Sequence, residues 1–305
     1  MDLVSAFRTF VRVAETESFS AAARELNVGQ PAVSKQVSSL EDYLGARLFQ
    51  RSTRSLALTD EGQELLIHAR IAIEAVDEAT DRLRRREGRV SGILRMTTTA
   101  SFGRMHIVPR LGLLETQYPD LKVDLMLQDA NANLVEQGLD LAIRFGEPRE
   151  PNLIAKRMGS IRRIVVASKD YLDRQGRPET PRDLEQHECI VFGGRPDSDE
   201  WEFSVGGETE TIKVNWRLRI DNSDGMRQAA LSGLGIIMAP SWLFPDLWEL
   251  ENMETLLDDY ERPSFPMYAV YPSRRFTPSK VRAMIDFLEF EIRLDPSMTG
   301  GAALI

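Results

Sequence analysis

Apolar residues recur at helical spacing at the start of the chain, and a second short helical pattern follows before a sharp break. The periodic positions of the first helix are Leu3, Phe7, Phe10 and Val11. The break is the segment NVGQP at 27–31, where Asn27 tolerates a left-handed backbone and Pro31 suits the first turn of a new helix. Two helices joined by a tight turn are therefore predicted, as in a helix-turn-helix unit.

The second helix of this unit has one apolar face and one small polar face. Val33, Val37 and Leu40 recur at steps of four and three, which indicates a buried face. The opposite face carries side chains that can meet base edges in a DNA groove, namely Gln30, Pro31, Ala32, Ser34 and Lys35. A helical bundle with a solvated face is the alternative interpretation of the same pattern.

A short basic hairpin is predicted after the second helix. Residues 48–49 and 56–58 supply its two apolar arms, and the tip QRSTRS carries Arg51, Thr53 and Arg54. Guanidinium groups and hydroxyls suit DNA phosphates or the minor groove. The order of helix, turn, helix and basic hairpin predicts a winged helix-turn-helix DNA-binding domain over residues 1–59.

A long helical pattern follows over residues 60–89. Thr59 is a natural N-cap, and Asp60 and Glu61 lie in the first turn, where acidic side chains favour a helix. The apolar positions fall at steps of four and three, as in a coiled coil: Leu65, Ala69, Ala72, Val76, Ala79 and Leu83. The helix could instead lie across its own domain. Dimerisation is the favoured interpretation, because two recognition helices spaced one DNA turn apart require a two-fold partner.

Strand and helix patterns alternate beyond residue 92, which is typical of an α/β fold. Strands are predicted within 93–101, 121–129, 141–146, 162–168, 189–192, 218–221, 236–240 and 266–272. A short helix is predicted over 131–140 and an amphipathic final helix over 279–292. The expected domain, 90–295, has two lobes with a cleft between them: lobe I comprises 91–163 and 268–293, and lobe II comprises 164–267. Residues 296–305 are expected to form a flexible tail.

Charge and cysteine content narrow the class of protein. The chain has 305 residues and a formal net charge of −9, which disfavours nonspecific coating of nucleic acid. Residues 1–89 are nearly neutral, however, and arginines gather at 47, 51 and 54. The chain has no long apolar run, no secretory pattern at its N-terminus and one cysteine, so we expect a cytoplasmic protein with no membrane partner.

His187 and Cys189 are the strongest candidates for catalytic or metal chemistry. A Cys/His pair can act as a nucleophile and base, and both residue types bind metals. The alternation in HECIVF places both residues on one strand face, where a small buried cysteine is ordinary. The structural interpretation is therefore favoured, and we expect neither a cofactor nor enzymatic activity.

The segment SFSAAARELNVGQPAVSKQVSSLEDYLGARLFQRSTRSLALTDEG at 18–62 resembles the DNA-binding domain of the LysR-type transcriptional regulators. Residues 91–293 resemble the effector domain of that family, which has the fold of type 2 periplasmic binding proteins. The motifs of this second match are GILRM, YPDLKVDL, GLDLAIRFG, VASKDYL, DLEQHECI and GLGIIMAP. Gly29 departs from the family pattern, in which serine or threonine is common, so a side-chain cap for the recognition helix is lost.

The resemblance implies two functional sites. DNA contacts are implied for Ser20, Gln30, Pro31, Ala32, Ser34, Lys35, Arg51, Thr53 and Arg54. An effector cleft is implied at Thr98, Thr99, Ser101, Phe102, Asp129, Arg144, Asn222, Ser223 and Met226. Ordinary hydroxyl capping is the alternative for the threonines and serine, and a structural ion pair is the alternative for Arg144. Asp129 would repel an anion, so the cleft either prefers a ligand with a donor group or is largely unused.

The sequence therefore predicts a sequence-specific DNA-binding transcriptional regulator with an N-terminal winged helix-turn-helix, a linker helix and a two-lobed α/β effector domain. The implied partners are double-stranded promoter DNA, an unknown small-molecule effector and further copies of the chain, as a homodimer and a dimer-of-dimers homotetramer. RNA polymerase is a further candidate partner. A solute-binding protein or an enzyme on the same two-lobed fold is the alternative, but a solute-binding protein would need a secretory signal and no DNA reader.

Overall fold

The computed structural model contains two compact units, one formed by residues 1–89 and one formed by nearly all of the chain from residue 90 onward. The residues that the structure describes are 1–51, 56–84, 90–130, 132–148, 150, 152–193, 196–247, 249–263, 265–272 and 277–295. Each unit is described separately below.

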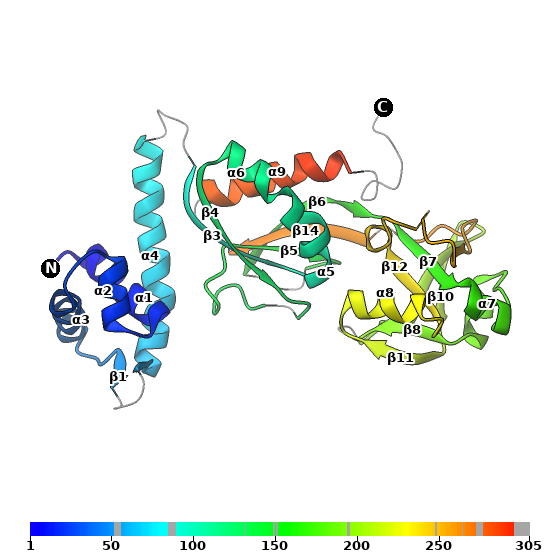
Figure 1. Ribbon diagram of the computed structural model, residues 1–305, viewed down its shortest axis with the longest axis horizontal. Helices are drawn as coiled ribbons and strands as arrows, with labels where there is room; N and C mark the ends of the chain where they lie inside the picture. Colours follow the sequence, from blue (N-terminus) through cyan, green and yellow to red (C-terminus); the bar gives the residue numbers. More distant parts are fainter. Residues whose placement is uncertain are drawn as a thin grey trace. The chain divides into compact units, whose positions relative to one another are not determined.

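The N-terminal unit contains the predicted helices and hairpin (Figure 1). Its elements are α1 (Leu3–Thr16), α2 (Phe19–Glu25), α3 (Gln30–Leu44), β1 (Phe49–Arg51), β2 (Leu56–Leu58) and α4 (Asp60–Arg84). Strands β1 and β2 pair antiparallel and form the predicted wing. Phe10, Val33 and Leu40 are fully buried, so α1 and α3 share one core.

The turn between α2 and α3 has the predicted backbone geometry. Asn27 is left-handed, with φ 54°. Ser18 caps α2, because its hydroxyl accepts a hydrogen bond from the Ala21 amide at 3.2 Å. Gly29 is the N-cap of α3 and provides no side-chain bond, as its lack of a hydroxyl predicts.

One face of helix α4 packs on its own domain, and other described positions of the helix are exposed. Leu65 is partly buried against the domain core and Ala69 is fully buried in it. Because Ala69 has no exposed surface, its assignment to a partner-facing seam is wrong. Farther along α4, the side chains of Ile71 and Val76 are 40% and 42% exposed. The side chain of Leu83 lies outside the described residues.

The second unit contains two five-stranded mixed sheets, one in each lobe. The lobe I sheet has the order β4-β3-β5-β14-β6, with β3 at Ser91–Thr98, β4 at Asp120–Leu127, β5 at Leu141–Phe145, β6 at Leu153–Ile161 and β14 at Phe265–Pro272. Strand β3 pairs in parallel with β4 and β5, whereas β14 pairs antiparallel with β5 and β6. The lobe I helices are α5 (Ala100–Phe102), η2 (Gly103–Ile107), η3 (Val108–Arg110), α6 (Leu111–Gln117) and α9 (Ser279–Arg293).

The lobe II sheet has the order β11-β8-β12-β7-β13. Its strands are β7 (Arg163–Ser168), β8 (Cys189–Phe192), β11 (Trp216–Ile220), β12 (Ile236–Pro240) and β13 (Met253–Leu256). Its helices are α7 (Lys169–Gln175), η4 (Pro181–Gln186), α8 (Ser223–Leu231) and η5 (Ser241–Leu243). A separate antiparallel hairpin, β9 (Glu200–Val205) and β10 (Glu208–Lys213), packs on the lobe II core.

Three features of this unit differ from the sequence prediction. Residues 134–138 form turns, so the helix predicted over 131–140 is wrong for its described part. Strand β14 begins in the lobe I sheet at Phe265, so the return to lobe I precedes residue 268. Strands β6 and β13 and the β9–β10 hairpin were not predicted.

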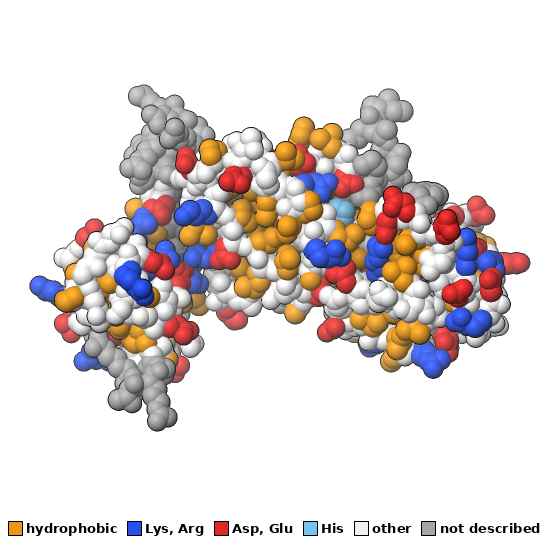
Figure 2. Space-filling view, viewed as in Figure 1, with side chains coloured by type: hydrophobic (Ala, Val, Ile, Leu, Met, Phe, Trp, Pro, Cys, Tyr) orange, Lys and Arg blue, Asp and Glu red, His pale blue; other side chains and the backbone are white. Residues whose placement is uncertain are grey.

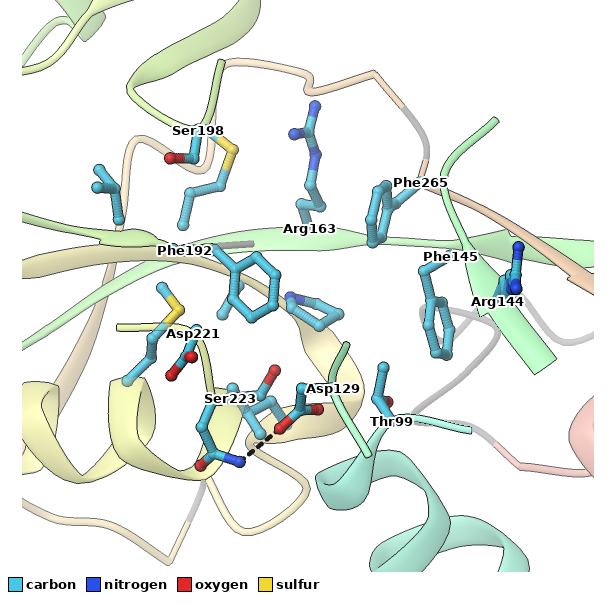
Figure 3. A pocket seen from close by; sticks show the side chains of 18 of the residues that line it. Thr99, Asp129, Arg144, Phe145, Arg163, Phe192, Ser198, Asp221, Ser223 and Phe265 are labelled. Carbon is cyan, nitrogen blue, oxygen red and sulfur yellow. Dashed lines mark hydrogen bonds between the residues drawn. The ribbon is translucent and has the colours of Figure 1, made fainter. Parts of the chain in front are cut away.

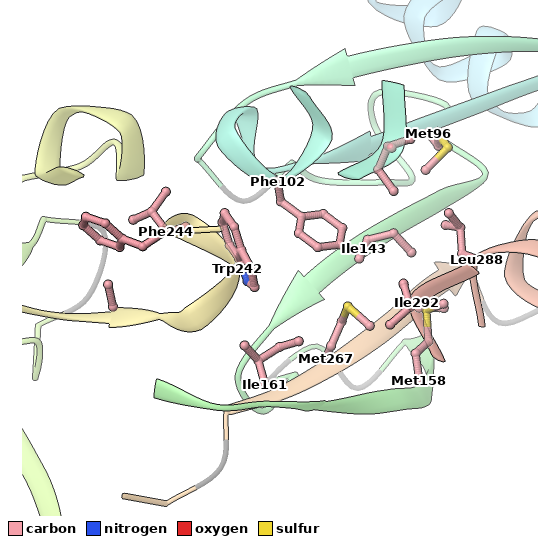
Figure 4. Close-up of a cluster of buried hydrophobic side chains, with 14 of the residues drawn as sticks. Met96, Phe102, Ile143, Met158, Ile161, Trp242, Phe244, Met267, Leu288 and Ile292 are labelled. Atoms are coloured by element: carbon pink, nitrogen blue, oxygen red, sulfur yellow. The ribbon is translucent and has the colours of Figure 1, made fainter. Parts of the chain in front are cut away.

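One hydrophobic cluster runs through both lobes (Figure 4). Trp242 of lobe II lies edge-on to Phe102 of lobe I, with ring centroids 5.3 Å apart. Its ring centroid also lies 5.7 Å from that of Phe145. Since Phe102 and Trp242 are buried together and Phe145 is partly buried against them, the two lobes are joined by a shared core as well as by the chain crossings.

Candidate DNA-binding surface and ligand cavity

The outer face of α3 carries polar groups that the described residues leave unbound. Gln30, Pro31, Ala32 and Lys35 are exposed and Ser34 is half-buried. The opposite face is buried at Val33, Val37, Leu40 and Glu41. Ser20, on α2, is also exposed. The structure therefore brings together the residues predicted to contact DNA in this part of the unit.

Side-chain hydrogen bonds fix the orientation of α3 on α1. The Gln36 amide donates to the Ser5 hydroxyl at 2.8 Å, and the Thr9 hydroxyl donates to the Gln36 carbonyl oxygen at 2.9 Å. Both ends of one amide are thus held by α1, which limits rotation of α3 about its own axis. This pair of contacts keeps the outer face of α3 pointed to solvent.

A buried carboxylate connects the end of α3 to the wing. Glu41 is only 5% exposed, and its carboxylate accepts from the Leu48 amide at 2.8 Å and from the Arg47 guanidinium at 3.0 Å. The wing is also packed by the Phe49 ring, whose centroid lies 5.4 Å from that of Phe10. Sequence reasoning missed Glu41, although an acid next to Leu40 on an apolar helix face is a recognisable signal.

The structure describes only part of the wing that is predicted to contact DNA. Arg51 ends β1, but its side chain is not described, and Thr53 and Arg54 lie outside the described residues. The base of the wing is tightly built, because the Thr59 hydroxyl donates to the Arg47 carbonyl at 2.6 Å and accepts from the Gly62 amide at 2.9 Å. A Cβ added at Gly62 would overlap the Leu48 carbonyl oxygen.

A cavity of about 940 Å³ lies between the lobes of the second unit (Figure 3). The predicted effector residues that line it are Thr98, Thr99, Asp129, Arg144, Asn222, Ser223 and Met226. Ser101 and Phe102 do not line it. Ser101 is fully buried, and the Phe102 ring belongs to the interlobe cluster, so their assignment to the cavity wall is wrong.

Asp129 and Asn222 form a hydrogen bond across the lobes at the cavity wall. The Asn222 amide donates to Asp129 Oδ2 at 2.5 Å, and the Ala100 amide donates to Asp129 Oδ1 at 3.1 Å. Asn222 also caps α8, since its Oδ1 accepts from the Gly225 amide at 2.9 Å. The dashed bond in Figure 3 is the Asp129–Asn222 contact.

Arg144 lines the cavity, but its guanidinium is engaged by neighbours. It forms an ion pair with Glu150 and donates to the Ala132 carbonyl at 2.6 Å. The structure therefore shows the ion pair that was the alternative interpretation of this residue. Any ligand anion would have to compete with Glu150 for its charge.

Much of the cavity wall was not predicted from the sequence. The additional aromatic residues are Phe145, Phe192, Trp201, Trp242 and Phe265, and the additional charged residues are Arg163, Asp197, Glu200, Glu202 and Asp221. Several of them come from β9, whose acidic and aromatic residues alternate in EWEF. That alternation is a signal for a half-buried strand, but it does not reveal which surface the strand faces.

The surroundings of His187 and Cys189 favour a structural role for both residues. Cys189 is fully buried, and burial raises the pKa of its thiol to about 12, so it holds its proton and is a poor nucleophile. His187 Nδ1 lies 3.2 Å from the Tyr171 hydroxyl. Within the described ranges, no three His, Cys, Asp or Glu side chains are grouped so that they could hold a metal ion. Likewise, no described helix has the length and apolarity to cross a membrane.

A winged helix-turn-helix followed by a long helix and a two-lobed domain defines a class of transcriptional regulators. Residues 4–63 match the bacterial regulatory helix-turn-helix protein, lysR family, and residues 87–291 match the LysR substrate binding domain. The HTH-type transcriptional regulator PtxR of Pseudomonas aeruginosa is 32% identical, with 94% of this chain and 92% of PtxR covered.

Two solved regulators have the same architecture. CrgA, a LysR-type transcriptional regulator from Neisseria meningitidis, is 27% identical with a TM-score of 0.60, and the match covers 94% of this chain and 98% of CrgA. The Vibrio cholerae virulence activator AphB is 26% identical with a TM-score of 0.56, over 94% and 98% of the two chains. The chain belongs to the LysR family and is a DNA-binding transcriptional regulator.

Proposed function

We propose that this regulator reads its operator with the outer face of α3 and responds to a small molecule in the interlobe cavity. The observation that carries the DNA-binding half is the outer face of α3. Gln30 and Lys35 are exposed and Ser34 is half-buried on this face, whereas the opposite face is anchored to α1 by the Gln36 contacts. A helix of this kind can enter the major groove with its orientation already fixed.

Base contacts are assigned to the first turns of α3. Gln30 can pair with adenine, Lys35 with guanine or a phosphate, and Ala32 with a thymine methyl group. Ser20, Pro31 and Ser34 lie on or beside the same face and complete the contact surface. Arg51, Thr53 and Arg54 of the wing are proposed to bind phosphates or the minor groove.

The effector is proposed to act through the Asp129–Asn222 contact. This hydrogen bond joins the lobes at the wall of the cavity, so a ligand that binds there changes the balance between arrangements of the two lobes. Thr98, Thr99, Arg144, Ser223 and Met226 supply the remaining predicted contacts. Ligand binding alters transcription only if its affinity differs between the two arrangements.

The protein is proposed to act as a homodimer through the exposed face of α4 and as a homotetramer formed by two dimers. Ala72, Val76 and Ala79 are the described seam residues that retain exposed surface, with Leu65 at the margin of the domain core. A two-fold dimer places two copies of α3 on successive turns of DNA. Promoter DNA in the cytoplasm is the proposed target, and RNA polymerase bound at that promoter is the proposed downstream partner.

Selection of bound fragments from the source genome, followed by footprinting, tests the DNA-binding half of the proposal. We expect a long two-fold footprint that survives excess random DNA. Gln30→Ala and Lys35→Ala should each weaken binding to that site by about 1–3 kcal/mol without unfolding the protein. Lys122→Ala, an exposed charge change on β4, is the matched control and should leave affinity unchanged. Wild-type affinity in both α3 variants would exclude this helix as the reader.

A further inference from the structure

The wall of the interlobe cavity is acidic. Among the described residues that line it, only Arg144 and Arg163 are cationic, whereas five residues carry carboxylates: Asp129, Asp197, Glu200, Glu202 and Asp221. Figure 3 shows Asp129 and Asp221 on the same side of the cavity, below the Phe192 ring in that view. An anionic ligand in this cavity would be repelled by these carboxylates.

The two arginines do not offset this charge in a way that favours an anionic ligand. Arg144 is paired with Glu150 and donates to the Ala132 carbonyl, as described above. Arg163 donates through Nε to the Pro263 carbonyl at 3.3 Å. In Figure 3 the Arg163 side chain extends away from the side on which Asp129 and Asp221 lie.

Two buried threonines beside the cavity have hydroxyl oxygens without a partner among the described residues. Thr97 and Thr98 are 4% and 3% exposed, both line the cavity, and neither hydroxyl oxygen has a hydrogen-bond partner among the described residues. Thr97 and Thr98 are consecutive residues of β3, so their side chains point to opposite faces of the sheet and at most one of the two hydroxyls is directed at the cavity. Buried polar atoms are normally paired, and a bound molecule can supply a partner for that hydroxyl. A hydroxyl oxygen can accept from an N–H group.

Aromatic side chains complete the wall. Phe145, Phe192, Phe265 and Trp201 line the same cavity and supply apolar surface for a ligand body. The faces of such rings also attract cations. The carboxylates and the ring faces favour a positively charged nitrogen over a carboxylate, whereas a threonine hydroxyl can donate or accept and serves a ligand of either charge.

We propose that the effector is an organic cation, namely a small molecule with a protonated amine or amidine on an apolar or aromatic body. This inference rests on the proposed function, since it assigns the chemical class of the ligand to the same cavity. Asp221 and Glu202 are assigned to the charged nitrogen, because both line the cavity and neither has an ion-pair partner within the described part of the chain.

Calorimetric titration of the full-length protein with probes matched in shape and opposite in charge tests the proposal. The probes are phenylethylammonium with phenylpropanoate, and benzamidinium with benzoate. We expect the cations to bind and the matched anions to bind at least about tenfold more weakly, as loss of a charge-assisted hydrogen bond implies. Asp221→Asn and Glu202→Gln should each weaken cation binding about tenfold or more. Glu208→Gln, on exposed β10 and outside the cavity, should not.

Three results would overturn the inference: tighter binding of the anions, binding of no cationic probe, or unchanged cation affinity in the Asp221→Asn, Glu202→Gln double variant. The footprint experiment on the same preparation separates this failure from failure of the regulator assignment. A retained operator footprint with anion-selective binding refutes only the ligand class. Cation binding without any footprint supports the ligand class and refutes the proposed reader.

Discussion

Gly62 shows how one missing side chain can set the geometry of a whole site. It lies in the first turn of α4, where its amide is capped by Thr59, and a Cβ there would overlap the Leu48 carbonyl oxygen at the base of the wing. The helix can approach the wing this closely only with glycine at this position. In the sequence alone, Gly62 is only an interruption near the start of a helical pattern.

Gly62→Ala should therefore destabilise the N-terminal unit by about 1–3 kcal/mol, because the backbone must move to admit the methyl group. Chemical denaturation followed by the helical circular dichroism signal measures the change. The matched control is Gly112→Ala in α6, where no atom lies within 4 Å of an added Cβ. That variant should be neutral or more stable by up to about 1 kcal/mol, and equal destabilisation in both would refute the packing argument.

His106 makes the stability of the effector domain depend on pH. Its ring stacks on Phe102 at 5.2 Å, its Nε2 lies 3.3 Å from the Trp242 carbonyl oxygen, and its Nδ1 lies 3.4 Å from the Asp295 carboxylate. Burial lowers the pKa of His106 below its ordinary 6.5, although the Trp242 carbonyl and Asp295 act in the opposite direction. Asp295 is itself paired with Arg110 at 2.6 Å.

A lowered histidine pKa means that the unfolded chain binds more protons than the folded chain below about pH 6.5. Stability is thus complete above that pH and falls as the solution is acidified through it. The chain's four tryptophans all follow residue 200, so their fluorescence reports the effector domain. We expect His106→Gln to flatten the pH dependence of unfolding between about pH 7.5 and about pH 5. The exposed His68→Gln should retain the wild-type slope. A wild-type slope in the His106→Gln variant as well would exclude His106 as the cause of the pH dependence.

Helix α4 illustrates how a single element can serve two partners. Its apolar period predicts one continuous seam, but the first part of that seam is used by its own domain, where Ala69 is fully buried. A heptad pattern cannot tell an internal neighbour from an external one, because both require the same spacing. Burial in the folded unit makes that distinction and leaves Ala72, Val76 and Ala79 for a second chain.

Val76→Glu should weaken the proposed dimer at least about tenfold, since an unpaired carboxylate would be buried between the two helices. Sedimentation velocity across a concentration series measures the change in dimer dissociation. Gln63→Glu adds the same charge at an exposed position near the start of α4 and should leave dimerisation unchanged. A dimer that tolerates Val76→Glu would place the interface elsewhere.

The elements that sequence patterns predicted best are those with local causes. Asn27, Pro31 and the apolar steps of α3 determine the helix-turn-helix within a few turns of chain, and the structure reproduces it. The cavity residues Thr99 and Asp129 were also anticipated, because the family resemblance implies an effector cleft at these positions. Glu200, Trp201 and Glu202 were not, since long-range packing decides what the β9–β10 hairpin faces.

At the scale of the whole molecule, the interlobe cluster makes the two lobes one cooperative unit. Phe102 and Phe145 of lobe I contact Trp242 of lobe II, so unfolding of either lobe exposes part of the other's core. Backbone amides of β3 and β12 should therefore exchange hydrogen with the same free energy of opening. Trp242→Ala should lower both values together by about 3–5 kcal/mol. Unequal values in the wild-type protein would show that the lobes open independently.

The shared interlobe core also decides how this chain can be recombined. A hybrid that joins residues 1–89 to the second domain of a relative keeps each core intact, so it should retain the operator and acquire a different inducer. An exchange of lobe II alone would need cuts near residues 162 and 264 and would place a foreign residue against Phe102 and Phe145 in the position of Trp242. The segment to exchange between relatives, for example in the construction of a biosensor, is therefore the complete two-lobed domain.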